Sequence, residues 1–191
     1  MKLLFATHNQ NKVVELKKLV PKYIDIFSLT DINCHKEIEE TGKTLEENAK
    51  IKADFIKYKY GLDCFADDSG LEIEALNGAP GVYSARYAGE EKNNASNIQK
   101  VWSELEKKGN TNACFRSVFY AHLGSKTYTF EGRVDGNIIF NKKGKDGFGY
   151  DPIFIPVGYD KTFAELGDVI KNKISHRAKA TQSLLDTLLR L

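Results

Sequence analysis

The sequence predicts an α/β protein built around one well-filled core. Its 191 residues are 41% hydrophobic and 28% charged, values typical of a globular protein with a single domain. Apolar runs with strand character alternate with stretches whose apolar residues recur at helical spacing. The runs are residues 2–7, 24–29 and 63–67, and the helical stretches are residues 13–20, 44–61 and 94–108.

Charge and cysteine content narrow the class of protein. A formal net charge of +2 gives no electrostatic reason to expect a nucleic-acid or membrane-surface partner. The apolar run at the N-terminus is too short for a signal peptide, and no stretch approaches the length of a membrane span. Cys34, Cys64 and Cys114 are isolated and odd in number, which favours free thiols of a cytoplasmic protein.

The first strand, residues 2–7, runs into a polar loop that opens a helix ending at Pro21. Backbone N–H groups at such a helix start suit an anion, and Lys12 adds a positive charge. The alternative is an ordinary helix capped by Asn9 or Asn11, with a solvated lysine. A second strand at residues 24–29 and a polar loop with three glutamates at residues 30–43 follow.

The next helix is predicted between Thr44 and Gly61. Thr44 and Glu47 have the spacing of a capping box, and Gly61 is typical of a helix end. Asn48 and Lys52 lie four residues apart on one face, beside the apolar stripe. A lysine in that position either extends to water or points into a cleft.

The strand at residues 63–67 leads into Asp67-Asp68-Ser69-Gly70, which we interpret as an acidic turn before a half-buried strand through Leu71, Ile73 and Ala75. Adjacent carboxylates at the end of a buried strand are costly unless a cation compensates them. Mg²⁺ suits such oxygen ligands, and lysines or arginines would serve as well. The alternative is a polar turn without a function.

The second half predicts further strands and helices. A turn at residues 77–81 precedes a loop in which Ser84 and Arg86 are expected only to pack. A helix spans residues 94–108, a hairpin turns at Gly124-Ser125 between residues 113–123 and 126–134, residues 137–140 extend the strands, and residues 153–155 form a short strand.

Two segments near the C-terminus suit a nucleotide. In residues 142–152, glycines around Phe148 allow close approach of a flat ligand, and Phe148 and Tyr150 have the right chemistry to stack on a base. Ser175-His176-Arg177 opens the last helix, where cations oppose the helix dipole unless an anion binds. The alternative for this segment, with Lys171 and Lys173 upstream, is a loop of solvated charges.

Acidic and basic residues recur at strand and helix ends. If they converged on one cleft, they would suit a polyphosphate with Mg²⁺, because phosphoryl chemistry needs cations, a metal and a carboxylate that orients water. The residues are Lys12, Lys52, Lys171, Arg177, Glu39, Glu40, Asp67 and Asp68.

Seven ordered blocks, spread over essentially the whole chain, resemble one family. The blocks are Thr7-His8-Asn9-Gln10-Asn11-Lys12, Glu39-Glu40-Thr41-Gly42, Glu47-Asn48-Ala49 with Lys52-Ala53, Ala66-Asp67-Asp68-Ser69-Gly70-Leu71, Gly78-Ala79-Pro80-Gly81-Val82-Tyr83-Ser84-Ala85-Arg86, Gly147-Phe148-Gly149-Tyr150-Asp151-Pro152 and Ser175-His176-Arg177. In this order the chain resembles the inosine triphosphate pyrophosphatases, which remove non-canonical purine nucleotides.

The resemblance implies an elongated mixed sheet with flanking helices and two lobes around a central cleft, all within one domain over residues 1–191. It implies hydrolysis of ITP, dITP or XTP to the monophosphate and pyrophosphate. It also implies Mg²⁺ as cofactor, a small-molecule nucleotide as substrate, and a homodimer.

Residue roles follow from the same resemblance. Asp68 is expected to accept the proton of the attacking water and to bind metal, with Glu39 as the other metal carboxylate. Phosphates are expected to bind Thr7, His8, Asn9, Gln10, Asn11, Lys12, Ser69, Lys171 and the catalytic Lys52, whereas the base and ribose are expected to bind Phe148, Gly149, Tyr150, Asp151, His176 and Arg177.

Chemistry suggests how the base is selected. Arg177 offers only hydrogen-bond donors, so it suits the 6-oxo group of hypoxanthine or xanthine and leaves the 6-amino group of adenine unpaired. His8 departs from the family, which often has a small residue there, so His8 is a candidate for a contact of its own.

Other functions remain open on the sequence alone. One is a related pyrophosphatase acting on pyrimidine nucleotides. Another is a module that senses a nucleotide without hydrolysing it, although a sensor has no need of a general base. A purely structural interaction protein is the third.

Overall fold

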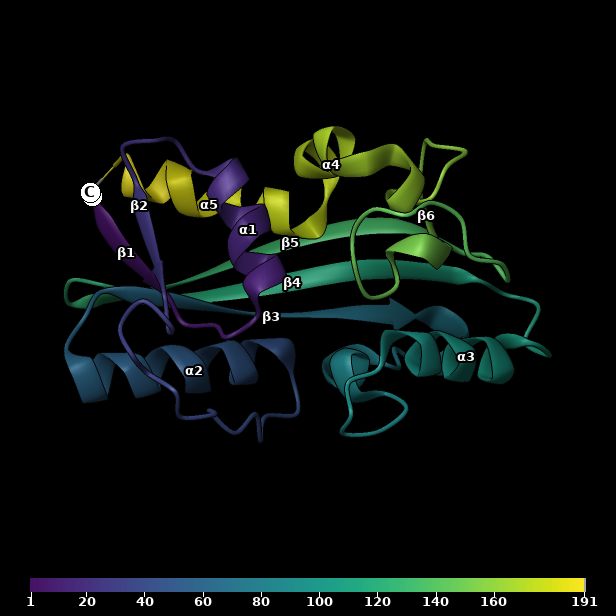
Figure 1. Cartoon of the computed structure of the whole chain (residues 1–191), viewed down its shortest axis with the longest axis horizontal. Helices are drawn as coiled ribbons and strands as arrows, with labels where there is room; N and C mark the ends of the chain where they lie inside the picture. The colour runs from purple at the N-terminus through teal and green to yellow at the C-terminus, as the bar shows by residue number, and fades with distance from the viewer. Residues whose placement is uncertain (191) are drawn as a thin grey trace. The chain divides into compact units, whose positions relative to one another are not determined.

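The structure is a computed structural model that describes residues 1–190. Its six strands form one sheet in the order β2-β1-β3-β4-β5-β6. β1 pairs in parallel with β2, in the register Leu3↔Ile26, and with β3, in the register Leu4↔Cys64, whereas β5 and β6 are antiparallel. The sheet is therefore mixed, and with its flanking helices it confirms the predicted α/β class (Figure 1).

The elements follow the predicted order closely. The strands are β1 Lys2–Phe5, β2 Asp25–Ser28, β3 Cys64–Ile73, β4 Asn112–Leu123, β5 Lys126–Ile138 and β6 Phe154–Pro156. The helices are α1 Gln10–Leu19, α2 Leu45–Tyr60, α3 Asn94–Leu105, α4 Phe163–Ile174 and α5 His176–Leu188, with short 3₁₀ turns η1 Glu74–Leu76, η2 Gly81–Arg86 and η3 Asp151–Ile153.

The chain divides into two compact units. The first comprises Met1–Asp68, Ser117–Gly132 and the chain from Arg177 onward; the second comprises Ser69–Arg116 and Arg133–His176. The predicted cleft between two lobes stays a prediction. Among residues 1–190, no helix combines the length and apolar character needed to cross a membrane.

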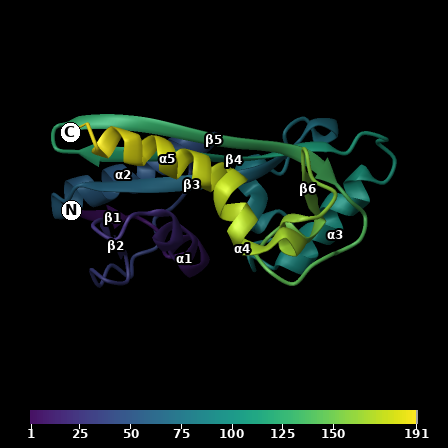
Figure 2. The ribbon, with the colours of Figure 1, turned by 90° about the horizontal axis from the view of Figure 1, so that it is seen from above.

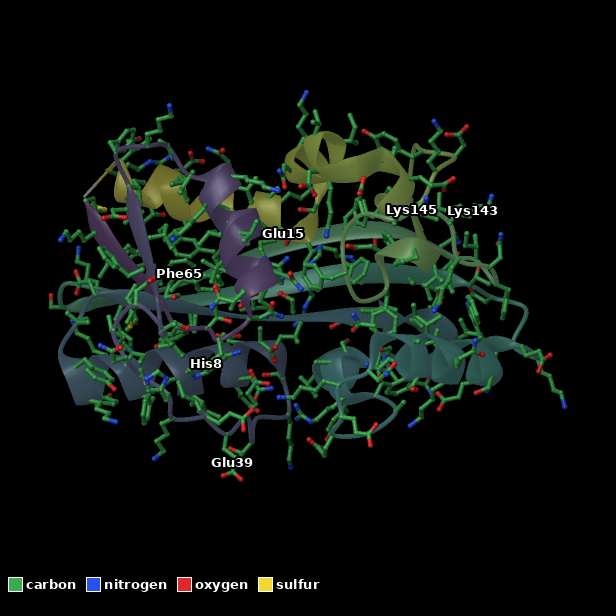
Figure 3. The ribbon with its side chains drawn as sticks, in the orientation of Figure 1. His8, Glu15, Glu39, Phe65, Lys143 and Lys145 are labelled. Atoms are coloured by element: carbon green, nitrogen blue, oxygen red, sulfur yellow. The ribbon has the colours of Figure 1, made fainter. Side chains whose placement is uncertain are left out.

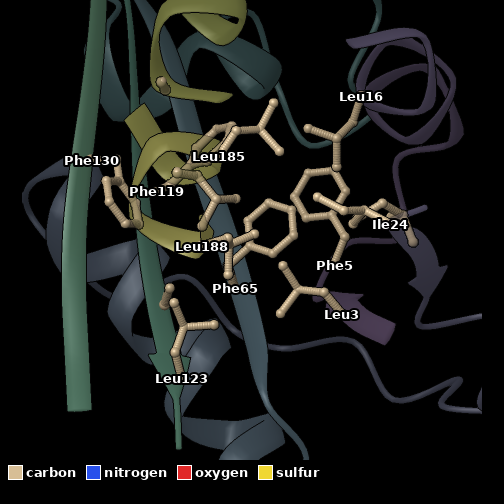
Figure 4. Packing of buried hydrophobic residues seen from close by; sticks show 14 of the residues in the cluster. Leu3, Phe5, Leu16, Ile24, Phe65, Phe119, Leu123, Phe130, Leu185 and Leu188 are labelled. Atoms are coloured by element: carbon tan, nitrogen blue, oxygen red, sulfur yellow. The ribbon is translucent and has the colours of Figure 1, made fainter. Parts of the chain in front are cut away.

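In the first unit, the strands separate two apolar layers. Phe5 and Phe65 stack with their ring centroids 4.6 Å apart, in a cluster with residues of α1 and α5 (Figure 4). Figure 2 shows α5 lying along the strands of this unit. Cys64 and Ala66 instead join a cluster with Ala53 and Ile56 of α2. Alternate residues of β3 thus face α1 and α5 on one side and α2 on the other, as strand geometry requires.

In the second unit, α3 and α4 cover a separate aromatic core. Phe115 of β4 lies edge-on to Phe154 of β6 with ring centroids 4.7 Å apart. The same cluster includes Leu71 and Ile73 at the end of β3 and Val101 of α3. The Trp102 indole donates to the backbone carbonyl of Ile139 at 2.8 Å, so the amphipathic stripe of α3 is core, as predicted.

Helix caps explain where the site-bearing helices start. Asn9 caps α1 by accepting from the backbone N–H groups of Asn11 and Lys12. Thr44 caps α2 by accepting from Glu47 N. The Glu47 carboxylate accepts from the backbone N–H of Lys43 at 2.6 Å rather than from Thr44, so the reciprocal bond of a capping box is replaced.

The predicted acidic turn is wrong, because β3 runs without interruption from Cys64 to Ile73 through both aspartates. The turn expectation rested on the local preferences of Asp, Ser and Gly. Partners distant in sequence override those preferences by compensating the buried carboxylates. Gly70 also favours a strand here, because a Cβ at this position would lie 2.4 Å from the Gly81 carbonyl oxygen.

Helix α4 was not predicted from the sequence, and the alternative of a loop around Lys171 and Lys173 is wrong about the backbone, because both residues lie in this helix. Its signal was present: Thr162 and Glu165 form a complete capping box. Gly167 obscures the helical spacing, because its non-helical backbone, with φ of 69°, kinks the helix there.

We expect Gly70→Ala to destabilise the second unit by about 1–3 kcal/mol, since the added methyl group would press on the backbone of Gly81. Chemical denaturation measures this change. Gly78→Ala is the control for adding a methyl group, because no atom lies within 4 Å of a Cβ there, although its φ of +86° adds a backbone cost. A Gly70→Ala protein as stable as wild type would contradict the close packing of β3 against η2.

Candidate active site

Asp67 is the buried centre of a charge network in the first unit. The Lys12 ammonium lies 2.9 Å from Asp67 Oδ1, and the Arg177 guanidinium lies 3.4 Å from Asp67 Oδ2. Arg177 also pairs with the carboxylate of Glu15 in α1. Asp67 is 0% exposed and Arg177 is 2% exposed. Two acidic and two basic groups therefore compensate each other around a carboxylate that water does not reach.

The electrostatics of Asp67 follow from these partners. Burial alone would raise its pKa, but the positive charges of Lys12, Arg177 and Lys52 outweigh burial and hold the pKa well below its usual range. Asp67 is thus a permanent anion whose charge is already matched. Its role in the first unit is to hold Lys12 and Arg177 in place.

Asp68 faces a different environment. The side chain of Asn48 donates to Asp68 Oδ2 at 3.0 Å, and Asp68 is 6% exposed. Burial and the negative charge of Glu40 raise its pKa above the ordinary value, although Lys52 and Lys12 oppose the increase. A carboxylate with a raised pKa is a better proton acceptor than an ordinary one, which suits a general base.

Lys52 does not extend to water. Its ammonium group forms an ion pair with Glu40, and the residue is 8% exposed. Burial alone would lower the pKa of Lys52, but Asp68, Glu40 and Asp67 raise it, so the amine stays charged. The attraction of Lys52 in turn outweighs the burial of Glu40 and lowers the pKa of that carboxyl.

The predicted phosphate loop lies at the start of α1. Thr7 is buried and accepts from the backbone N–H of Asn9 at 3.1 Å, while Gln10 donates to Thr30 at 3.4 Å. His8, Asn9, Gln10 and Asn11 are all exposed. His8 makes a contact of its own, because its Nε2 lies 3.1 Å from the carbonyl oxygen of Lys36. The alternative prediction of an Asn9 cap is confirmed, but the predicted solvated lysine is wrong for Lys12.

Among the candidate metal ligands, Glu39 and Glu40 differ sharply. Glu39 is exposed, and Figure 3 shows its side chain pointing outward from its loop, whereas Glu40 is half-buried beside Lys52. Within residues 1–190, no group of three or more His, Cys, Asp or Glu side chains is arranged to hold a metal. Asp68 with one of these glutamates nevertheless fits Mg²⁺, which commonly takes one or two carboxylates plus substrate phosphates.

In the second unit, Asp151 organises the glycine-rich loop. Its Oδ2 accepts from Lys171 Nζ at 2.7 Å and from the backbone N–H of Phe148 at 2.8 Å. The Lys171 ammonium also lies 4.8 Å from the Phe148 ring centroid. Gly147 permits this turn, because a Cβ there would lie 2.2 Å from the Asp151 carboxylate. The arrangement fixes Phe148 next to a buried cation.

The two aromatic candidates for stacking on a base have different environments. Tyr150 is 4% exposed, and its hydroxyl donates to the backbone carbonyl of Ser84 at 2.8 Å. Burial raises its pKa. Phe148 is only half-buried, as are Gly149 and Ser69. Phe148 therefore has the accessible ring surface that stacking needs, while Tyr150 joins its loop to the core of the second unit.

The alternative of solvated charges before the last helix is wrong for Lys171, whereas Lys173 is exposed as that alternative expects. Lys171 is 3% exposed and His176 is 4% exposed, and the imidazole of His176 stacks on Phe115 with ring centroids 4.9 Å apart. At the start of α5, Glu15 and Asp67 supply the negative charge that Arg177 needs. A protein carboxylate pair thus offsets the dipole cost that the sequence analysis attributed to a bound anion.

Glu15 and Asn48 are the residues whose contacts the sequence analysis missed. Glu15 sits between Val14 and Leu16 in an otherwise lysine-rich helix, and its only signal is its closeness to the apolar stripe. For Asn48, the signal is its place beside the apolar stripe of α2, on one face with Lys52. The sites of phosphate and base binding assigned by resemblance stay predictions.

A model of the Ham1 family matches residues 3–187 of the chain. The chain belongs to the Ham1 family. It is 53% identical over 188 residues to the dITP/XTP pyrophosphatase of Christiangramia forsetii, covering 98% of this chain and 99% of that one. Identity to the dITP/XTP pyrophosphatase of Bacillus subtilis is 50%, with coverage of 95% and 93%.

Solved structures of Ham1 relatives share the fold. The Ham1 protein of Staphylococcus aureus is 39% identical with a TM-score of 0.88, over 100% of this chain and 98% of that one. A HAM1 protein from Coxiella burnetii is 38% identical with a TM-score of 0.91, over 100% of both chains. These likenesses agree with the resemblance drawn from the seven sequence blocks.

We expect Asp67→Asn to lower the free energy of unfolding by about 3–5 kcal/mol at neutral pH, because Arg177 and Lys12 would lose a buried anion. A folded pKa below the unfolded one stabilises the protein above the unfolded value of about 3.9, and this stabilisation is lost as the pH falls further. The difference between variant and wild type should therefore shrink below about pH 4. Denaturation at several pH values measures it, with the exposed Asp25→Asn as control; a constant difference down to pH 2 would contradict the assignment.

Proposed function

We propose that the protein hydrolyses non-canonical purine nucleoside triphosphates (ITP, dITP and XTP) to the nucleoside monophosphate and pyrophosphate, and so removes them from the nucleotide pool. The proposal rests chiefly on one observation: a buried Asp68 with a raised pKa, next to the Lys52–Glu40 ion pair, in a Ham1 chain. The names of relatives that are about half identical over nearly the whole chain support the substrate class.

The proposed chemistry is a hydrolytic displacement. Asp68 accepts a proton from water as the water oxygen attacks the α-phosphorus, the bond from that phosphorus to the bridging oxygen breaks, and pyrophosphate leaves. Lys12 and Lys52 supply positive charge for the phosphate oxygens, and the buried ammonium group of Lys52 stabilises developing negative charge better than a solvated one would. The start of α1 offers backbone N–H groups to the same anion.

We propose Mg²⁺ as the cofactor, held by Asp68 and Glu39, with Glu40 as the nearer carboxylate to Asp68. When bound, Mg²⁺ would neutralise charge on the phosphate oxygens. Lys52 would keep Glu40 charged and oriented. The oxygen-only character of these side chains is what supports this ion over softer metals.

We propose that Phe148 and Arg177 contact the base. Phe148, held by Asp151 and Lys171, would stack on the purine. Arg177 has only donors to offer, which suits a 6-oxo purine and leaves an adenine amino group unpaired. Such a mismatch at a buried site can discriminate strongly between bases.

The proposal also covers the oligomeric state and the cellular location of the protein. We propose a homodimer in the cytoplasm, with no nucleic-acid or membrane partner. Free, buried cysteines support a reducing compartment: Cys34, Cys64 and Cys114 are all unpaired by disulfides. Burial raises the pKa of Cys64 to about 12 and that of Cys114 to about 11, so neither is a ready nucleophile.

We expect ITP and XTP with Mg²⁺ to yield pyrophosphate and a monophosphate, and ATP to react far more slowly. Initial rates across a panel of nucleotides, with and without Mg²⁺, measure this preference. Release of orthophosphate alone would contradict the cleaved bond. Faster turnover of pyrimidine nucleotides would instead favour the related pyrimidine enzyme, and tight ITP binding without turnover would favour a sensor.

We expect Asp68→Asn to lower kcat by about 10²-fold or more, because positioned general bases contribute about 10²–10⁴-fold. The fold should persist, since an amide oxygen at position 68 can still accept from Asn48. Steady-state kinetics and circular dichroism measure the two effects, with Asp25→Asn as the matched surface control. A rate within twofold of wild type would exclude Asp68 as the base.

A further inference from the structure

Asn48 is a buried polar residue that has no assigned role in the chemistry although it contacts the proposed general base, Asp68. It is the fourth residue of α2 and is 0% exposed. Its amide joins two elements of the first unit: Oδ1 accepts from the backbone N–H of Gly42 at 2.8 Å, and Nδ2 donates to Asp68 Oδ2 at 3.0 Å. A buried amide with both ends engaged in this way can occupy few alternative positions.

The helix that presents Asn48 is itself firmly packed. Thr44 caps its start, and Ala49 and Ala53 on its inner stripe are 0% exposed. Four residues after Asn48, Lys52 holds Glu40 through an ion pair. One turn of α2 therefore contacts the loop at Gly42, and the next contacts it at Glu40, so the loop lies along the helix.

The loop fits this helix only because position 42 is glycine. A Cβ there would lie 2.7 Å from Asn48 Oδ1 and 2.7 Å from Glu47 Cβ. Real Cβ atoms do not tolerate such contacts with packed neighbours. The close approach of Gly42 to Asn48 is thus a built feature of the loop.

We propose that Asn48 is a positioning residue for the reaction, which fixes the Asp68 carboxylate relative to the loop that bears Glu39 and Glu40. This inference rests on the proposed function, because Asp68 needs positioning only if it takes part in catalysis. One hydrogen bond orients one oxygen of Asp68, and the other bond anchors the loop to the same rigid helix. Misplacement of a reacting group by about 1 Å can cost about 10²-fold in rate.

Three variants separate this role from ordinary stabilisation. Asn48→Ala removes both bonds. Asn48→Asp keeps an acceptor for Gly42 but replaces the donor to Asp68. Asn97→Ala is the matched control, because Asn97 is also a buried helical amide, 2% exposed, and it bonds backbone groups only, Ala88 N at 2.7 Å and Ala85 O at 3.0 Å.

The test combines kinetics on ITP with hydrogen exchange at the Gly42 amide. We expect both Asn48 variants to lose about 10-fold to 10²-fold in kcat, with KM changed less than about threefold. Gly42 exchange should accelerate in Asn48→Ala only. Asn97→Ala should lose stability while keeping kcat within about threefold of wild type.

The possible outcomes test the positioning role of Asn48 separately from the proposed pyrophosphatase activity. Wild-type protein that hydrolyses no nucleotide would overturn the proposed function. An active wild type with an unchanged kcat in Asn48→Asp would overturn the inference, as would equal losses in Asn97→Ala and Asn48→Ala. If Asn48→Ala fails to fold, Asn48→Asp, which keeps the bond to Gly42, decides the question.

Discussion

Adjacent side chains of a β-strand point to opposite faces of a sheet, and this constraint governs the acidic pair in β3. In a turn, Asp67 and Asp68 would share one site and repel each other. In the strand, Asp67 meets Lys12 of α1 and Arg177 of α5, whereas Asp68 meets Asn48 of α2. One dipeptide thereby supplies two carboxylates with opposite pKa shifts.

The two faces of β3 place Asp67 and Asp68 in different electrostatic environments. On the Asp67 face, Lys12 and Arg177 form ion pairs with the buried carboxylate of Asp67. On the Asp68 face, burial and the negative charge of Glu40 raise the pKa of Asp68 more than Lys52 and Lys12 lower it. A buried ion pair contributes little net stability compared with apolar packing, but losing one partner is costly. We infer that the network is kept for the placement of charge rather than for stability.

Much of this arrangement could be predicted from the sequence, and the reasons for the misses are physical. Apolar periodicity located α1, α2 and α3, and local residue types located the hairpin of β4 and β5, the cap at Thr44 and, for α1, a cap at Asn9 or Asn11, because each of these depends on neighbouring residues. The path of β3 depends instead on cations brought by α1 and α5, more than 50 residues away in the case of Lys12. The turn preferences of Asp, Ser and Gly contain no information about those distant cations. Glu15 was missed for the same reason, since its partner Arg177 is 162 residues away.

A crystal structure of the wild-type protein with Mg²⁺ and an ITP analogue whose α–β bridge resists hydrolysis would show whether Asp68, Lys12 and Lys52 meet around the triphosphate. We expect the triphosphate to contact Lys12 and Lys52, Asp68 to be among the residues that would hold the metal, and Asp67 to keep its contacts with Lys12 and Arg177. A nucleotide bound away from Asp68, or a metal held by neither Asp68 nor the loop glutamates, would contradict this expectation.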